Sequence, residues 1–562
     1  MKTRKLFIYA ALSLATLSLS SCHDWLTDGT PGVSHPEDYL TSGKALVELV
    51  NATYTPNMWE YGGGAYFSEW YIGDIASDDA LKGGQGVTDG LDAYEIDNFK
   101  VNPNNEILLE YYRGIWQGIG RCNYAMSVLP TSKVEDEVLT ATPTKKTNVV
   151  NTTVKERLIG EVQFMRAMYY FRLVRVFGGM PLIDFVVDTK DKWAQKRASQ
   201  EETYNFIIKD LEAAEKVLWL KSQYAQEDMG RATKGAAQAM LLKTHLYLAG
   251  FLAQEGKTTE ATEHYQKARD WGKLVRTSQE YSLCGTYFDN FTLVGENGPE
   301  SVFEVQYVEN PEGDYGSSEG GYGFTLGTFS VILQRSRSDK LTDGDKGWGW
   351  DKPTQNLYDE YEAGDIRRDA TILNPTDDQM EIATQEIYLG DRYLSKKYAM
   401  YTDGDGGTTY KLAHATRGPI NQKVIRYADV LLMYAEACCE TGEAADLTEA
   451  KAALNEVRTR AGLTGFPGYT YNVNGVAQTT NDNQEDLRKA IRHERRVELA
   501  MEAHRWFDLC RWGVAKATLE AYIARESEAA KAEFGTFAPK NVLFPIPQKE
   551  VELSGIKQND GY

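Results

Sequence analysis

Apolar positions recur at helical spacing along several long segments of the chain. In residues 160–177 (GEVQFMRAMYYFRLVRVF), Phe164, Met168, Phe171 and Phe177 fall near one face, with arginines between them. The next four residues, GGMP, cannot continue a helix. The pattern therefore predicts an amphipathic helix that ends at Phe177.

Further helices are predicted at residues 235–250, 258–275 and 427–442, and they carry a repeat. Ala261, Tyr265 and Ala268 show the small, aromatic, small spacing of the second helix of a tetratricopeptide unit, in which small residues let two antiparallel helices approach. The same offsets recur at Ala450, Leu454 and Val457 and, more loosely, at Tyr204, Ile208 and Leu211. We expect a mostly α fold: a tetratricopeptide-like, right-handed helical scaffold with large irregular loop inserts and a few short strands.

Two inserts interrupt the helical pattern, at about residues 54–100 and 281–420. Both are dense in glycine, aspartate and aromatic residues, a composition typical of irregular loops. The segment 301–308 (SVFEVQYV) is the clearest strand candidate within them. Aromatic side chains make up 11% of the chain, so some of those in the loops are candidates for ligand stacking.

The N-terminus predicts export and lipidation. A basic tip precedes the apolar stretch 6–19, which is too short to span a bilayer core of roughly 30 Å. Leu19-Ser20-Ser21-Cys22 then resembles the bacterial lipobox, in which the cysteine is acylated and becomes the first residue. We expect residues 1–21 to be a lipoprotein signal peptide, Cys22 to be the lipidated residue, and residues 22–562 to form a single domain.

Charge and cysteine content exclude several classes of protein. The 61 basic residues against 81 acidic ones give a net charge of -20 with no basic run, which argues against nucleic-acid binding. Beyond Cys22 there are five cysteines, an odd number without a CxxC pair. They predict small buried side chains and no disulfide framework or metal site.

No catalytic motif occurs in a context that would support it. His493-Glu494 is followed by Arg495, Arg496 and Val497, so the second histidine of HExxH is missing. The GxSxG match at 316–320 lies in a glycine-rich loop, whereas a nucleophile elbow needs a strand before it and a helix after it. We expect no enzymatic activity.

Two segments begin like calcium loops, at Asp343 and Asp403. Their twelfth positions are Thr354 and His414, where an EF-hand loop has glutamate. We expect no cofactor. A weak structural calcium site is the one alternative that the sequence leaves open.

The C-terminal third carries a family pattern. Residues 491–512 (IRHERRVELAMEAHRWFDLCRW) resemble the signature helix of the SusD/RagB-like family of outer-membrane nutrient-binding lipoproteins. Further resembling segments stand in the expected order at 160–183, 347–372, 424–442 and 543–562. Within the signature segment, we expect a scaffold network of ion pairs and caps, with Trp506 and Trp512 packed beneath. Its members are Glu494, Glu498, Glu502, Arg505, Asp508 and Arg511.

The resemblance implies a lipid-anchored lid on the exterior of the outer membrane. Such a lid caps a SusC-like TonB-dependent transporter and passes it glycan oligomers, or sometimes peptides. Ligand binding in this family tends to use aromatic and polar residues of the loops between the first helices and of the large insert. We nominate Trp59, Tyr61, Trp70, Asp79, Lys82 and Tyr94 from the first insert and Tyr315, Tyr322 and Trp348 from the second.

Three alternatives remain open on the sequence. The same lid role would serve peptides or another nutrient. A surface glycoside hydrolase or esterase would need a carboxylate pair or a nucleophile elbow in its proper context. A purely structural repeat protein would bind a partner and no small ligand, against which the aromatic loops argue.

Overall fold

The computed structural model describes residues 40–60, 68–134, 152–309, 326–337, 346–375, 392–400 and 412–562. Several positions singled out above lie outside these ranges: Cys22, Tyr61, Tyr315, Tyr322, Asp343 and Asp403. Among the described helices, none is both long enough and apolar enough to cross a membrane.

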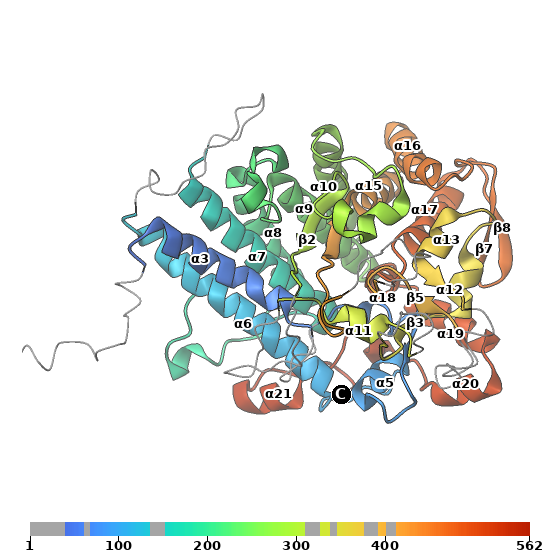
Figure 1. Cartoon of the computed structure of the whole chain (residues 1–562), viewed down its shortest axis with the longest axis horizontal. Helices are drawn as coiled ribbons and strands as arrows, with labels where there is room; N and C mark the ends of the chain where they lie inside the picture. Colours follow the sequence, from blue (N-terminus) through green and yellow to red (C-terminus); the bar gives the residue numbers. More distant parts are fainter. Residues whose placement is uncertain are drawn as a thin grey trace, which may run out of the picture.

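Long helices form the scaffold, and consecutive ones pack against each other from one end of the molecule to the other (Figure 1). They are α3 (Gly43–Tyr54), α6 (Glu106–Val128), α7 (Val154–Phe177), α8 (Gln200–Val217), α9 (Lys234–Gln254), α10 (Thr258–Thr277), α15 (Tyr427–Thr441), α16 (Ala444–Arg460) and α17 (Gln484–Glu498). The expected mostly helical, tetratricopeptide-like fold is confirmed.

Shorter helices lie mainly in the inserts and the C-terminal segment. They are α4 (Trp70–Gly73), α5 (Leu91–Asp97), α11 (Ser330–Gln334), α12 (Gln355–Glu360), α13 (Ile366–Thr371), α18 (Arg505–Arg511), α19 (Ala515–Arg525), α20 (Glu528–Glu533) and α21 (Gln548–Ser554).

The described strands pair as short antiparallel ribbons: β1 (Ala80–Gly83) with β3 (Trp350–Pro353), β2 (Ser301–Val305) with β6 (Gln422–Arg426), β4 (Ile372–Leu373) with β5 (Leu394–Ser395), and β7 (Thr470–Val473) with β8 (Val476–Thr479). The strand predicted at 301–308 is therefore found, but it ends at Val305.

Helix α7 lies in the middle of the scaffold. Its capping box joins Thr153 and Glu156 at one end, and Gly178 ends it as predicted. The prediction of an amphipathic helix was too simple, because α7 is buried on nearly every side. Arg157, Arg166 and Arg172 of this helix are buried too. Arg166 makes a bidentate pair with Asp210, at 2.7 and 2.8 Å.

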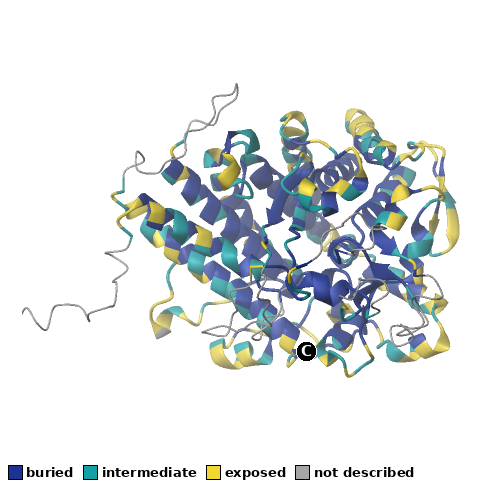
Figure 2. Cartoon of the chain, viewed as in Figure 1, coloured by how far each residue is buried: buried dark blue, intermediate teal, exposed yellow. Residues whose placement is uncertain are grey.

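Small residues let the repeat helices approach, as their spacing predicts. Ala261 and Ala268 on α10 are buried, and Tyr265 packs half-buried against the core. Dark inner faces and exposed outer loops are visible along the whole array (Figure 2). The cysteines of the described part are free, and all but the half-buried Cys510 are buried.

The signature segment is not one helix. Helix α17 ends at Glu498, and α18 begins only at Arg505. Between them Met501 and Ala503 both have φ of +62°. Asp74 accepts the Ala503 N–H, at 3.0 Å, and Lys397 donates to the carbonyl of Ala500, at 2.6 Å. The backbone groups released by the break are therefore bonded to other parts of the chain.

Candidate functional site

The two aromatic-rich inserts meet at one place. Strand β1 from the first pairs with β3 from the second, with Gly83 opposite Trp350. A second tie joins them, because the buried Glu60 carboxylate accepts hydrogen bonds from the Thr328 hydroxyl and the Phe329 N–H, both at 2.6 Å. Segments far apart in the sequence thus form one junction.

Five rings form an aromatic cluster at this junction: Trp70, Tyr71, Phe329, Trp348 and Trp350. Trp70 and Tyr71 stack at 3.9 Å, and Trp350 meets both edge-on, at 6.3 and 6.0 Å. Trp348 lies 6.3 Å from Trp350 and 5.4 Å from Phe329. Trp348 is the half-buried member and the others are buried. The cluster therefore reaches the surface through Trp348.

Two other nominated aromatics lie outside the cluster. Trp59 is buried under the guanidinium of Arg121, which lies 5.1 Å from its ring centre. Tyr94 is buried against the C-terminal segment, where its hydroxyl donates to Glu533, at 2.6 Å, and accepts from Lys100, at 2.7 Å. Of the nominated aromatics that the structure describes, it brings together Trp70 and Trp348.

Lys82 supports a loop from inside. Its ammonium donates to the carbonyls of Gly83, Gly86 and Asp89, at 2.6 to 2.9 Å, and lies 5.4 Å from the Trp350 ring centre. Burial lowers its pKa to about 8. The side chain has no exposed surface, and its hydrogen bonds shape the loop beside the cluster. Direct ligand contact by Lys82 stays a prediction.

Asp78 and Asp79 tie the first insert to the signature segment. Arg496 contacts both carboxylates, at 2.9 and 2.7 Å, and Arg505 forks onto Asp78, at 2.8 and 3.0 Å. Burial alone would raise the pKa of Asp78, but Arg496 and Arg505 outweigh it and lower this pKa to about 2. Asp79 is fully buried in this layer, so ligand contact by Asp79 also stays a prediction.

Two further buried carboxyl groups, those of Asp351 and Asp74, have raised pKa values, in contrast to Asp78. Burial raises the pKa of Asp351, next to Trp350, to about 8. Burial and the nearby Asp351 also raise the pKa of Asp74 well above its ordinary value. Asp351 accepts a hydrogen bond from the Gln334 amide, at 2.8 Å. Buried acids with a raised pKa at the junction are a feature that sequence reasoning missed.

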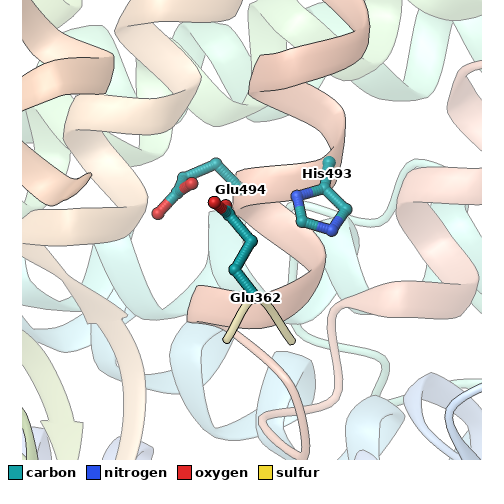
Figure 3. Close-up of side chains that lie close together, drawn as sticks. All are labelled: Glu362, His493 and Glu494. Atoms are coloured by element: carbon teal, nitrogen blue, oxygen red, sulfur yellow. The ribbon is translucent and has the colours of Figure 1, made fainter. Parts of the chain in front are cut away.

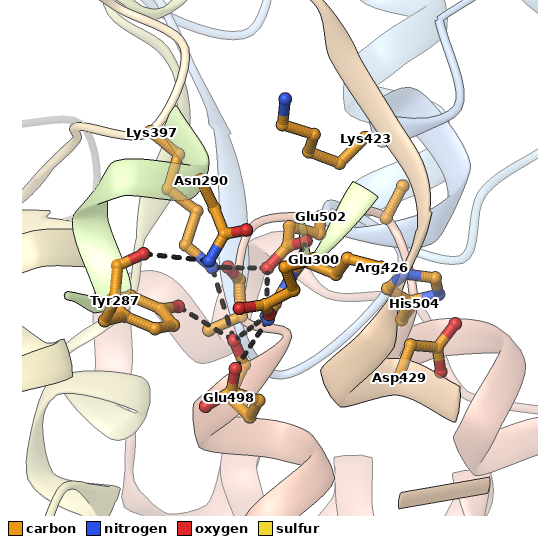
Figure 4. Close-up of polar contacts among 12 residues, drawn as sticks. Tyr287, Asn290, Glu300, Lys397, Lys423, Arg426, Asp429, Glu498, Glu502 and His504 are labelled. Carbon is orange, nitrogen blue, oxygen red and sulfur yellow. Dashed lines mark hydrogen bonds and ion pairs between the residues drawn. The ribbon is translucent and has the colours of Figure 1, made fainter. Parts of the chain in front are cut away.

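The expected scaffold network exists, but its partners come from other elements (Figure 4). Arg426, at the end of β6, binds Glu300 and Glu502, both at 2.8 Å, and Glu498, at 2.5 Å. Lys397 binds Glu502, at 2.6 Å. Only Asp508 and Arg511, 2.8 Å apart, pair as neighbours along the signature segment. Trp506 is buried as expected, and Trp512 is half-buried.

One group of side chains resembles a metal site. The ligand atoms of Glu362, His493 and Glu494 lie within 4.8 Å of one another (Figure 3). However, Arg458 donates to both carboxylates, at 2.8 Å each, and Arg367 donates to Glu494, at 2.6 Å. Arg458 already neutralises both carboxylates, so a metal ion would have to displace its guanidinium. These residues therefore fit an ion-pair network better than a metal centre.

The fold and the junction define a class of protein: a helical-repeat scaffold that holds loops with an aromatic cluster. The model described as "SusD family" matches residues 299–562, and the one described as "Starch-binding associating with outer membrane" matches residues 40–248. The chain belongs to the SusD/RagB-like family, as its motifs predicted.

Individual proteins match over most of the chain. A SusD-like protein of Bacteroides ovatus is 27% identical, over 72% of this chain and 66% of its own length. SusD-like protein P2 of Formosa agariphila is 26% identical over 88% of each chain. Among solved structures, a laminarin binding SusD-like protein is 25% identical with a TM-score of 0.72, covering 93% of this chain and 100% of its own.

Proposed function

We propose that this protein is a cell-surface lipoprotein that binds glycan oligomers and delivers them to a SusC-like TonB-dependent outer-membrane transporter. The similarity to a laminarin binding SusD-like protein over nearly the whole of both chains carries the proposal. The lipobox at Cys22 supports a lipid anchor that holds the protein on the exterior of the outer membrane.

The aromatic cluster is the proposed glycan site. Sugar rings present apolar C–H faces that pack on indole rings, while polar side chains and backbone groups take their hydroxyls. Trp348 is held by Phe329 and Trp350, so it offers a preorganised face at little cost in side-chain entropy. Tyr61, Tyr315 and Tyr322 stay candidates in the same two inserts.

Binding without catalysis fits the acids around the cluster. Asp78 and Asp79 are paired with arginines, and Asp74 and Asp351 are buried beneath the rings. A glycosidase needs one carboxyl group that protonates the leaving oxygen and a second that attacks or activates water, both in reach of the substrate. The described acids of the junction do not present such a pair to the surface.

The test is calorimetry with residues 23–562 against laminarin, starch, xylan and a casein peptide mixture. We expect saturable binding of one polysaccharide with no release of reducing ends. Binding of the peptide mixture and of no polysaccharide would mean that the protein carries peptides instead of glycans. Released sugar ends would overturn the non-catalytic role.

Trp348→Ala tests the site itself. Loss of one stacking face should weaken binding of that polysaccharide about tenfold, or about 1.4 kcal/mol. Because Trp348 is half-buried, the melting temperature should fall less than in Trp350→Ala, which removes a buried ring at a cost of about 3–5 kcal/mol. Unchanged affinity in Trp348→Ala would remove the cluster as the binding site.

A further inference from the structure

A groove of about 560 Å³ lies on the side of the scaffold, between α6, the loop after α7 and α21. Its volume falls in the range of roughly 300–1,000 Å³ that small-ligand sites occupy. Its lining is separate from the aromatic cluster, because no residue of the cluster belongs to it. In Figure 1, α21 lies beside the N-terminal half of α6.

The walls of the groove are fixed to its floor. Asn123 of α6 donates to the carbonyls of Ile183 and Phe185 in the loop, at 2.9 and 3.1 Å. Arg113 of α6 donates to Glu550 of α21, at 3.0 Å. The groove is thus a preformed hollow, so a ligand would not have to order it.

Aromatic and apolar side chains are exposed along this groove. Trp193 is 56% exposed and Leu553 is 57% exposed, and Val187, which also lines the groove, is exposed too. Trp116 lines the floor, where Tyr170 holds it edge-on at 5.8 Å. An exposed tryptophan and a second, fixed indole in the lining of one groove are typical of a binding surface.

The charge of the groove selects for a neutral ligand. Among the described residues that line it, only Arg113 and Glu550 are charged, and they neutralise each other, in a chain with a net charge of -20. The remaining polar lining includes the amides of Gln117 and Gln195. Indole faces combined with uncharged amides suit a ligand with apolar C–H faces and many hydroxyls, and suit a purely apolar ligand less well.

We infer that this groove is a second carbohydrate site, which takes one to three rings of a neutral oligosaccharide on Trp193 and Trp116. Such a site would hold a second stretch of a long glycan, or a separate chain, on the flank of the scaffold. With two sites, a polysaccharide is retained more strongly than by either site alone.

Hydrogen–deuterium exchange on residues 23–562 tests the inference, with laminarihexaose, maltohexaose and xylohexaose as separate probes. We expect one probe to slow exchange in residues 181–195 and in α6. Protection around the aromatic cluster only would overturn the second site and leave the proposed function standing. Protection in the groove only would keep the groove as a carbohydrate site and remove the aromatic cluster as one. Protection at neither place with any probe would overturn both sites.

Variants separate the two sites further. In a Trp348→Ala background, Trp193→Ala should weaken the residual binding of the protecting probe at least fivefold. Leu274→Ala, which removes an exposed apolar side chain from α10, is the matched control and should leave binding unchanged. Equal affinity with and without Trp193 would overturn the inference. So would groove protection that appears on raising the protein concentration alone, because a second copy would then cover the groove.

Discussion

At the scale of single residues, buried charge is the most informative feature of the junction. Asp78 and Asp351 both belong to the two inserts that meet at the junction, yet the pKa of Asp78 is lowered to about 2 and that of Asp351 is raised to about 8. Both are fully buried, so burial does not separate them. The difference comes from Arg496 and Arg505, which face Asp78, whereas Asp351 has an uncharged amide partner.

Asp351→Asn should stabilise the protein increasingly as the pH rises. The folded pKa is raised above the unfolded value of about 3.9, so the contribution of Asp351 to stability is fully present below pH ~4 and is lost as the pH rises towards 8. Asparagine keeps an acceptor for Gln334 and tolerates the positive φ of this position, +55°. The melting-temperature gain over the wild type should grow by about 1 to 3 °C between pH 5 and pH 9.

Thermal scans at pH 5, 7 and 9 check this expectation. Asp560→Asn is the control, since that carboxylate is almost fully exposed and its loss should leave the gap between variant and wild type nearly flat with pH. A gain for Asp351→Asn that is equal at all three values would mean that the acid is ionised throughout.

At the scale of elements, close packing of two helices depends on glycine at the point of contact. Two glycines of α6 illustrate this. A methyl group at Gly118 would lie 2.6 Å from the ring of Tyr169, whose hydroxyl is anchored on the carbonyl of Thr53, at 2.7 Å. A methyl group at Gly120 would meet nothing within 4 Å. One glycine is needed for contact between α6 and α7, and the other is not.

Gly118→Ala and Gly120→Ala should therefore shift stability in opposite directions. The first should lose about 1–3 kcal/mol, because Tyr169 is held and cannot retreat. The second should gain about 0.5–1 kcal/mol, the usual difference between alanine and glycine inside a helix. Denaturant unfolding of both variants measures the difference, and losses of equal size would contradict the packing seen here.

The break between α17 and α18 is stabilised by the network around Arg426. Replacing this residue with methionine leaves Glu300, Glu498 and Glu502 buried with one fewer cation, so we expect a loss of about 3–5 kcal/mol in the free energy of unfolding. Lys44→Met breaks an exposed pair with Glu48 and should cost less than about 0.5 kcal/mol. Similar small losses in both variants would show that the network adds little stability.

At the scale of the whole molecule, the proposed function depends on where the protein is held. Cys22→Ser should abolish incorporation of labelled palmitate and release the protein from outer-membrane fractions. Residues 23–562, which lack Cys22, should keep the melting temperature and glycan affinity of the lipidated protein. Growth of cells with labelled palmitate measures lipidation, fractionation measures membrane location, and calorimetry measures melting temperature and affinity. Labelled palmitate retained in Cys22→Ser would place the anchor elsewhere.

Much of the architecture could be predicted from local pattern. The spacing of Ala261, Tyr265 and Ala268 predicted an approach of two helices, and the composition of the two inserts predicted the regions that meet at the junction. The individual site residues were harder to predict. Nothing near Asp79 in the sequence indicates that Arg496, more than 400 positions away, would pair with it. The partners of Lys82 are close in sequence, but the pattern of residues does not show that its ammonium turns inward onto the carbonyls of residues 83–89.

By itself, the sequence determined most of the helices, the repeat spacing and the family, because each depends on residues close together in the chain, and for the same reason it predicts the lipobox. Only the tertiary structure decided the break at residues 499–504, the ion-pair partners of the signature segment and the pairing of Gly83 with Trp350. It also decided that Trp348 stays half-exposed while Trp59 is covered. These features depend on which distant groups satisfy buried charges and backbone polar groups, and periodicity along the chain does not record such partners.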